Sequence, residues 1–115
     1  MKKLSDLISF YEEICEQWGE YIANGGNSRK ANVLYKKIRV TENQIKETKE
    51  GSLRLLSFLE HPNGYVRLNA AVSLLGSFSL QAEKCLERLA KERENLGFIA
   101  EITLSEWKKG ALNVQ

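Results

Sequence analysis

The sequence is short of proline, cysteine and long apolar runs, and each shortage excludes a class of protein. It contains one proline in 115 residues, so helix interiors are spared the residue that most often breaks them. The two cysteines, Cys15 and Cys85, match no metal-ligand spacing, and a chain of this size with a full apolar core has little need of a disulfide framework. No stretch approaches the ~20 apolar residues of a membrane span. We therefore expect a helical protein of the cytoplasm, without a membrane segment.

An excess of charge of either sign is also missing, although the charge is unevenly placed. Lys and Arg number 17 and Asp and Glu 15, for a net charge of +2, which does not by itself indicate a nucleic-acid partner. Residues 1–24 hold two lysines against five acidic residues, whereas residues 25–49 hold seven basic residues against two acidic ones. These segments either neutralise each other across a helix pair or present separate patches.

Hydrophobic periodicity predicts an all-α fold of about six helices in a single domain, residues 1–115. Apolar residues recur at helical spacing along most of the chain, and no segment shows sustained strand alternation. The N-terminus reads as an amphipathic helix and not as a signal peptide, because charges interrupt its apolar run. The first expected helix has Ser5 as a possible N-cap and stops within residues 24–27, and the fifth is capped by Ser79. The others are 28 to about 49, 52–60, 65–75 and 95–109, and residues 110–115 are expected to form a flexible tail.

Some of these helices are more apolar than others, which predicts where the core lies. The fourth and the sixth are apolar nearly all round, as is typical of helices buried between neighbours. In the fourth, Asn69 and Ser73 define the polar edge, and Leu74 has small or apolar neighbours in the pattern. Leu53 is expected to face inward, and Gly51 to end the second helix. Core packing is also expected for four aromatic residues, Tyr11, Trp18, Tyr35 and Trp107.

A helix-turn-helix unit occurs twice, thirty positions apart. At this offset Leu56 matches Leu86, Ala70 matches Ala100, and Leu74 matches Leu104. A fixed period of this size indicates stacked helical repeats, in which each unit covers the apolar face of its neighbour. The repeats predict two hairpins, residues 52–76 and 80–109.

The stretch HPNGYVRLNAAVSLL resembles the second half of a HEAT repeat, whose pattern is Val-Arg-x-x-Ala-Ala-x-x-Leu. The positions that carry the resemblance are Val66, Arg67, Ala70, Ala71 and Leu74. The resemblance implies a short α-solenoid of stacked hairpins and a role in binding. The second repeat departs from the pattern, with glycine in place of the arginine, which suits a capping repeat with one face open to water.

A second resemblance covers about residues 20–90. Tyr21-Ile22-Ala23, then Ala31-Asn32 with Tyr35, then the HEAT-like unit, is similar to a family of small bacterial all-α proteins of unknown function. Some members of that family are thought to serve as immunity proteins beside secreted toxins. What this resemblance implies is a protein-binding role, with a toxin domain as the partner.

No residue of the sequence identifies a chemical reaction, so we expect no catalytic site, no cofactor and no metal. His61 is the only histidine, and no cysteine, aspartate or second histidine flanks it at ligand spacing. It is interpreted as a turn residue before Pro62. Cys15 and Cys85 lie on apolar stripes and are interpreted as small core residues.

Arg67 falls within the apolar arc of the fourth helix. A guanidinium there needs a partner, because an uncompensated buried charge is costly. The local candidates are Asn63, Glu60 and the carbonyls that end the third helix. We interpret Arg67 as structural, by the HEAT resemblance, with ligand contact as the alternative.

Charged helix faces offer two candidate binding surfaces. The residues that we expect to contact a protein partner lie on the acidic face of the first helix and in the turn before the fourth: Glu12, Glu13, Glu16, Glu20, His61, Asn63 and Tyr65. A basic protein such as a ribonuclease toxin would suit them. The alternatives are a nucleic-acid binder that uses Lys30, Lys36, Lys37 and Arg39, and a scaffold domain whose charged faces are simply solvated.

Overall fold

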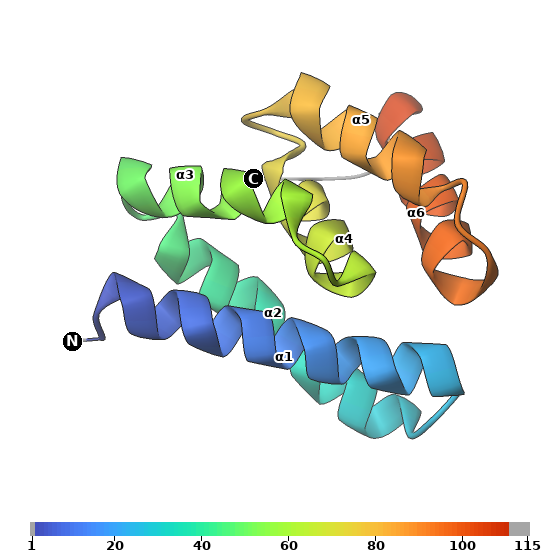
Figure 1. Ribbon diagram of the computed structural model, residues 1–115, viewed down its shortest axis with the longest axis horizontal. Coiled ribbons are helices and arrows are strands. Elements are labelled where there is room, and N and C mark those ends of the chain that lie inside the picture. Colours follow the sequence, from blue (N-terminus) through green and yellow to red (C-terminus); the bar gives the residue numbers. More distant parts are fainter. Residues whose placement is uncertain (1, 111–115) are drawn as a thin grey trace.

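The computed structural model describes residues 2–110, and within them all regular structure is helical (Figure 1). The all-α prediction of about six helices is confirmed. The last part of the expected tail, residues 111–115, lies outside the described residues. The elements are α1 (Leu4–Asn24), α2 (Ser28–Ile45), α3 (Lys49–Ser57), a 3₁₀ turn η1 (Phe58–Glu60), α4 (Gly64–Leu74), α5 (Ser79–Leu89) and α6 (Glu94–Lys108).

The helix α4 is the centre of the fold. The antiparallel pair α1 and α2 lies along one side of the molecule in Figure 1, and α4 contacts α1, α3, α5 and α6. Val66, Ala70, Ala71 and Leu74 of α4 are completely buried, because small and branched side chains let its neighbours approach closely. The prediction that the fourth helix is buried is confirmed.

The same prediction is wrong for α6. Only Gly97 and Ala100 of this helix are buried, while Phe98 is 63% and Ile102 45% exposed. The helix is apolar enough for a core position, but within residues 2–110 it packs on α5, α4 and α1, and these helices leave Phe98 and Ile102 uncovered.

The junction of α2 and α3 also differs from the expected one. The helix α2 ends at Ile45, and the Thr48 hydroxyl caps α3 by accepting the Gly51 N–H at 3.0 Å. Gly51 therefore lies inside α3, where a Cβ atom would meet the Ile45 carbonyl oxygen at 1.7 Å. Its role is close backbone approach and not helix termination. The position that α3 buries is Leu55, and Leu53 is exposed where it was expected to face inward.

The four aromatic residues expected in the core divide into three groups. Tyr11 and Trp18 are buried, as expected, and Trp107 is half-buried. Tyr35 is 42% exposed. It lies at the rim of the α1–α2 contact, with its ring against Trp18 on one side and the Arg39 guanidinium 4.8 Å away.

Candidate partner-binding site

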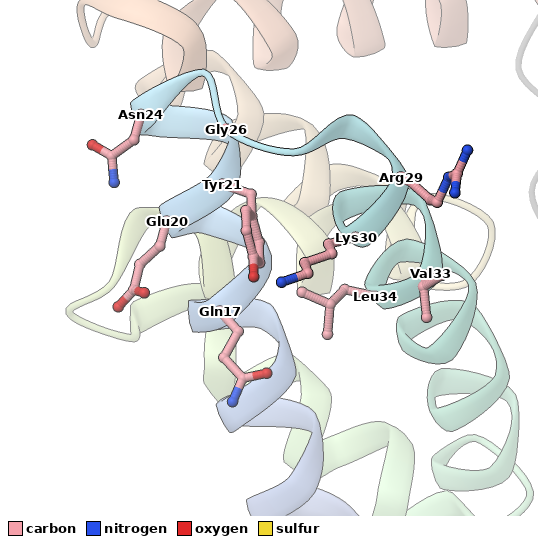
Figure 2. Close-up of a pocket in the computed structure, with 9 residues that line it drawn as sticks. All are labelled: Gln17, Glu20, Tyr21, Asn24, Gly26, Arg29, Lys30, Val33 and Leu34. Atoms are coloured by element: carbon pink, nitrogen blue, oxygen red, sulfur yellow. The ribbon is translucent and has the colours of Figure 1, made fainter.

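An open groove of about 750 Å³ runs between the second half of α1 and the first half of α2 (Figure 2). We call it the hairpin groove. Lys30 extends from α2 toward Tyr21 of α1, above Leu34, whereas Glu20 and Arg29 point outward on opposite sides. The residues that line the groove are Gln17, Glu20, Tyr21, Asn24, Gly26, Arg29, Lys30, Val33 and Leu34. All of them come from α1, α2 and the loop between these helices.

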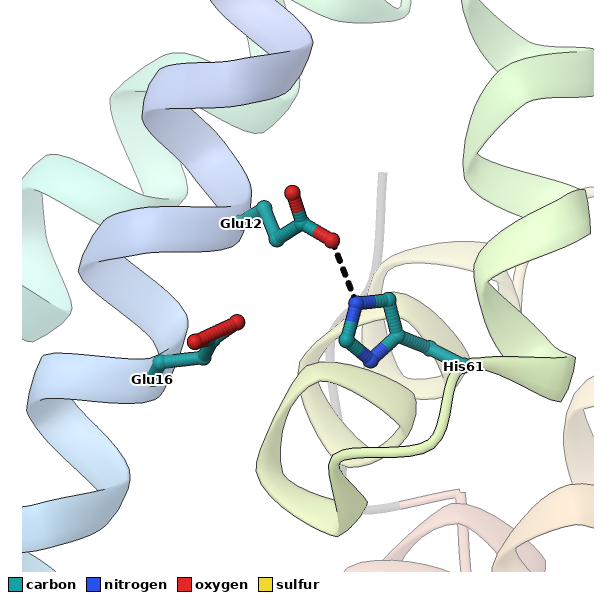
Figure 3. Close-up of side chains that lie close together, drawn as sticks. All are labelled: Glu12, Glu16 and His61. Carbon is teal, nitrogen blue, oxygen red and sulfur yellow. Dashed lines mark hydrogen bonds and ion pairs between the residues drawn. The ribbon is translucent and has the colours of Figure 1, made fainter.

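The second surface feature is the turn between η1 and α4, which places His61 against α1 (Figure 3). His61 has extended backbone angles, as expected before proline. The Asn63 side chain then caps α4 by accepting the N–H groups of Tyr65 and Val66 at 2.8 and 3.2 Å. Residues 61–65 are therefore held in one conformation by the turn and the cap together.

Hydrogen bonds on both ring nitrogens fix the imidazole of His61. The Asn63 backbone N–H donates to Nδ1 at 2.9 Å, so Nδ1 is the acceptor and the ring hydrogen is on Nε2. Nε2 lies 2.5 Å from a carboxylate oxygen of Glu12 and donates to it (Figure 3). This arrangement needs only the neutral ring, and it joins the middle of α1 to the turn.

Glu12, Glu16 and His61 also form a group whose ligand atoms lie within 4.8 Å of one another. Two carboxylates and an imidazole suit a divalent transition metal. A metal-bound histidine, however, normally donates its other ring N–H to an acceptor. The other nitrogen of His61 instead faces the Asn63 N–H, which is a donor. The geometry therefore favours a hydrogen-bonded clamp over a metal centre.

The structure divides the seven expected contact residues between two surfaces. Five of them lie around the turn: Glu12, Glu16, His61, Asn63 and Tyr65. Here the Tyr65 ring packs on Gly19, where a Cβ atom would lie 2.6 Å from it. The other two lie toward α2, since Glu20 lines the hairpin groove and Glu13 accepts a hydrogen bond from Gln17 of the same lining at 3.3 Å.

A further carboxylate lies near the turn. Glu94, at the start of α6, is close enough that its charge, after burial, raises the pKa of Tyr65. Glu12, Glu16 and Glu94 together are called the acidic face below. Glu94 comes from a segment that the sequence patterns did not associate with α1. Glu60 precedes His61 and is exposed, but it lines a hollow on the α5 side together with Lys84 and Arg88, so it is not part of this face.

A buried polar cluster joins α2 to α1 and α4. Arg39 Nη1 lies 3.1 Å from one carboxylate oxygen of Glu42, and Nη2 donates to the Asn69 side-chain oxygen at 2.7 Å. The Tyr11 hydroxyl donates to the other Glu42 oxygen at 2.5 Å. Arg39 is thereby engaged inside the protein, although the sequence placed it among candidate phosphate-binding residues.

The polar edge of α4 faces this cluster and not the solvent. Asn69 and Ser73 are 2% and 3% exposed. Asn69 accepts from Arg39, and the Ser73 carbonyl accepts from the Lys46 ammonium at 2.7 Å. Glu42 is also buried, and its burial raises its pKa to about 7 against the opposing effects of Arg39, Tyr11 and Lys46. Both Glu42 oxygens have partners, so the cluster is structural.

The thiols are buried, as their apolar stripes predicted. Burial raises the pKa of both, and the Glu42 charge adds to the effect at Cys15. A thiol whose pKa is raised is the opposite of an activated nucleophile.

The expected bonds of Arg67 are not formed within residues 2–110. The side chain is half-buried, and its Nε atom is buried without a hydrogen-bond partner in this part of the chain. One terminal nitrogen, Nη2, lies near Gly64, which the Leu96 side chain from the start of α6 also approaches. Its structural role stays a prediction.

No family model matches the chain, and no curated protein matches it. One solved structure is similar over the whole length, that of the protein RPA1889 from Rhodopseudomonas palustris CGA009. The TM-score is 0.87 and the sequence identity 20%, covering 100% of this chain and 96% of that chain. At this identity the likeness shows the fold alone. None of the helices in residues 2–110 has the length and apolar character to cross a bilayer.

Proposed function

We propose that this chain is a protein-binding module of the immunity type, which neutralises a toxin by covering a basic surface of it. The acidic face would make the contact, with His61, Asn63 and Tyr65 at its centre. The mechanism is steric and electrostatic occlusion, and it requires no catalytic residue. The class of partner is motivated by the resemblance to HEAT repeats and to a family of small bacterial all-α proteins of unknown function, some of which are thought to serve as immunity proteins.

The observation that carries the proposal is the convergence of acidic residues on a preorganised turn. Within residues 2–110, Glu12 is hydrogen-bonded to His61, whereas Glu16 and Glu94 form neither an ion pair nor a side-chain hydrogen bond. These carboxylates create a local negative potential. Because the clamp and the Asn63 cap hold the turn, a partner would pay little entropy to order it.

Nucleic acid is the weaker alternative. The engagement of Arg39 with Glu42 and Asn69 leaves Lys30, Lys36 and Lys37 as the exposed members of the proposed basic set. These lysines share α2 with Val33 and Val40, and no row of exposed aromatic residues accompanies them to stack bases.

The test starts from the neighbouring gene. If it encodes a toxin domain, co-expression of this chain should restore growth, and the two purified proteins should form a complex. Replacing Glu16 and Glu94 by lysine should slow association at least about tenfold at low salt, since surface charges mainly steer encounter. Glu87→Lys on the outer face of α5 is the matched control and should leave the rate unchanged.

Two results would overturn the proposal. One is a complex whose association rate is unchanged by Glu16→Lys and Glu94→Lys. The other is tight binding of duplex or single-stranded nucleic acid at physiological salt, with an affinity that falls steeply as salt rises.

A further inference from the structure

The outer face of the α1–α2 pair carries opposite charges that do not neutralise each other. Glu13 and Glu20 are exposed on α1, and Lys30 and Lys37 are exposed on α2. None of these four side chains forms an ion pair within residues 2–110. An acidic row and a basic row therefore run side by side, and no ion pair joins them in this part of the chain.

The register of the two helices sets the level of each charge. Tyr11 lies beside Glu42, and the Trp18 ring lies against Tyr35. The same antiparallel register puts Glu13 at the level of Val40, and Glu20 at the level of Val33. Lys37 falls between these two levels, and Lys30 lies one turn beyond Val33.

Apolar side chains and a hollow interrupt the charged rows. Val33 is 50% and Val40 58% exposed, on a helix whose remaining outer residues are polar. The hairpin groove opens beside them, with Leu34 and Tyr21 in its lining (Figure 2). No residue of α3, α4, α5 or α6 lines this groove, so the rest of the fold does not cover it.

We propose that a second copy of this chain docks on this face, around a twofold axis parallel to α1 and α2. Such an axis lays α1 of one copy over α2 of the other at the same level. Glu20 of each copy then lies over Val33 between Lys30 and Lys37 of the other, and Glu13 lies over Val40 beside Lys37. The charges match twice, as the symmetry of an isologous contact requires, and the two valines are covered.

The available area fits a reversible dimer. Two helices of about 30 Å length, side by side, offer roughly 600 Å² per copy, which is at the low end for a specific protein interface. The dimer should therefore depend on concentration and weaken as salt rises. The acidic face around His61 lies on the other flank of α1, so this inference is independent of the proposed function.

A charge-swap experiment tests the proposal on the full chain. The first variant carries Glu13→Lys and Glu20→Lys, and the second carries Lys30→Glu and Lys37→Glu. Each variant alone has like charges on both rows, so its dimer dissociation constant should rise at least about tenfold. Mixed in equal amounts, they should form a heterodimer, because both α1–α2 contacts then join opposite charges. Sedimentation velocity and light scattering measure the mass.

The controls separate association from folding. The helical circular dichroism and the melting temperature of both variants should equal those of the wild type, because the exchanged residues are exposed. A variant with Lys84→Glu and Glu87→Lys on α5 should keep the wild-type dimer. A wild-type chain that stays monomeric at millimolar concentration, or variants that fail to form a heterodimer on mixing, would refute the proposal.

Discussion

The helices α4 and α6 carry the matching sequence positions that lie thirty residues apart, yet α4 is buried at the centre of the molecule and α6 buries only Gly97 and Ala100. Ala70 and Ala100 are matching residues, and both are completely buried. Leu74 is also completely buried, whereas its counterpart Leu104 is only half-buried. The matching alanines are therefore buried alike, while the burial of the flanking positions depends on which helices pack against α4 and α6.

The largest difference should appear when the matching leucines are truncated. Leu74→Ala should lower the free energy of unfolding by roughly 2–5 kcal/mol, because it empties a packed site. Leu104→Ala should cost about 1 kcal/mol, since its side chain is already partly exposed. Urea denaturation, analysed with one m-value for all variants, measures both losses of unfolding free energy. Equal losses at the two sites would mean that α6 is packed as tightly as α4.

The polar cluster on the edge of α4 should make the free energy of unfolding depend on pH. The helix α6 should add no such dependence, because Ile99 and Thr103 stand where α4 has Asn69 and Ser73. Burial raises the Glu42 pKa from 4.5 to about 7, so the folded state binds this proton more tightly than the unfolded one. The resulting stabilisation is complete below pH 4.5 and is lost as the pH rises through 7. The loss amounts to about 3 kcal/mol at most.

The variant Glu42→Gln isolates this contribution, because the amide cannot ionise. The wild type minus variant difference in unfolding free energy should fall between pH 4.5 and 7 and level off above it. A difference that is constant over this range would show that Arg39 and Lys46 keep the carboxylate ionised throughout.

Substitutions at the N-termini of α4 and α6 should change the free energy of unfolding by smaller amounts. Asn63 caps α4 with its side chain, whereas Arg93 makes no capping bond at the start of α6. Asn63→Ala should cost about 1 kcal/mol, and Arg93→Ala should be close to neutral. Thermal unfolding resolves the two. A larger loss at position 93 would indicate an interaction of Arg93 that the helix end does not explain.

The smallest effect is expected on the open side of α6. Phe98 is mostly exposed, so Phe98→Ser should change the free energy of unfolding by less than about 0.5 kcal/mol. Val66→Ser, at a completely buried position of α4, is the contrasting control and should lower the free energy of unfolding strongly. A marked loss for Phe98→Ser would place this ring against another surface in solution.

The helices could be predicted from the sequence because local periodicity and capping residues determine them. The burial of α4 was predictable for the same reason, since its apolar residues surround the axis. The inward direction of this polar edge was not, because the groups that it meets lie 30 and 27 residues earlier: Arg39 of α2 bonds the Asn69 side chain, and Lys46, just after α2, bonds the Ser73 carbonyl. A helical wheel reports that an edge is polar, but it does not report whether that edge faces water or another polar group.

The candidate site was predictable in part. Glu12, Glu16 and His61 were each expected to contact a partner, but the hydrogen bond between Glu12 and His61 spans 49 positions and depends on how α1 crosses α4. Gly51 illustrates the reverse error. It carries the signature of a helix end, while its function is to let α3 pass close to the Ile45 carbonyl.

The clamp between His61 and Glu12 gives the molecule a spectroscopic reporter. Because the chain has a single histidine, its two ring nitrogens give one unambiguous pair of nitrogen resonances. In the arrangement described, Nε2 should show the shift of a protonated nitrogen and Nδ1 that of an unprotonated acceptor. Any ligand or partner that pulls the turn away from α1 would change this pair without a label being attached. The docking of the N-terminal helix can thus be followed in the unmodified protein.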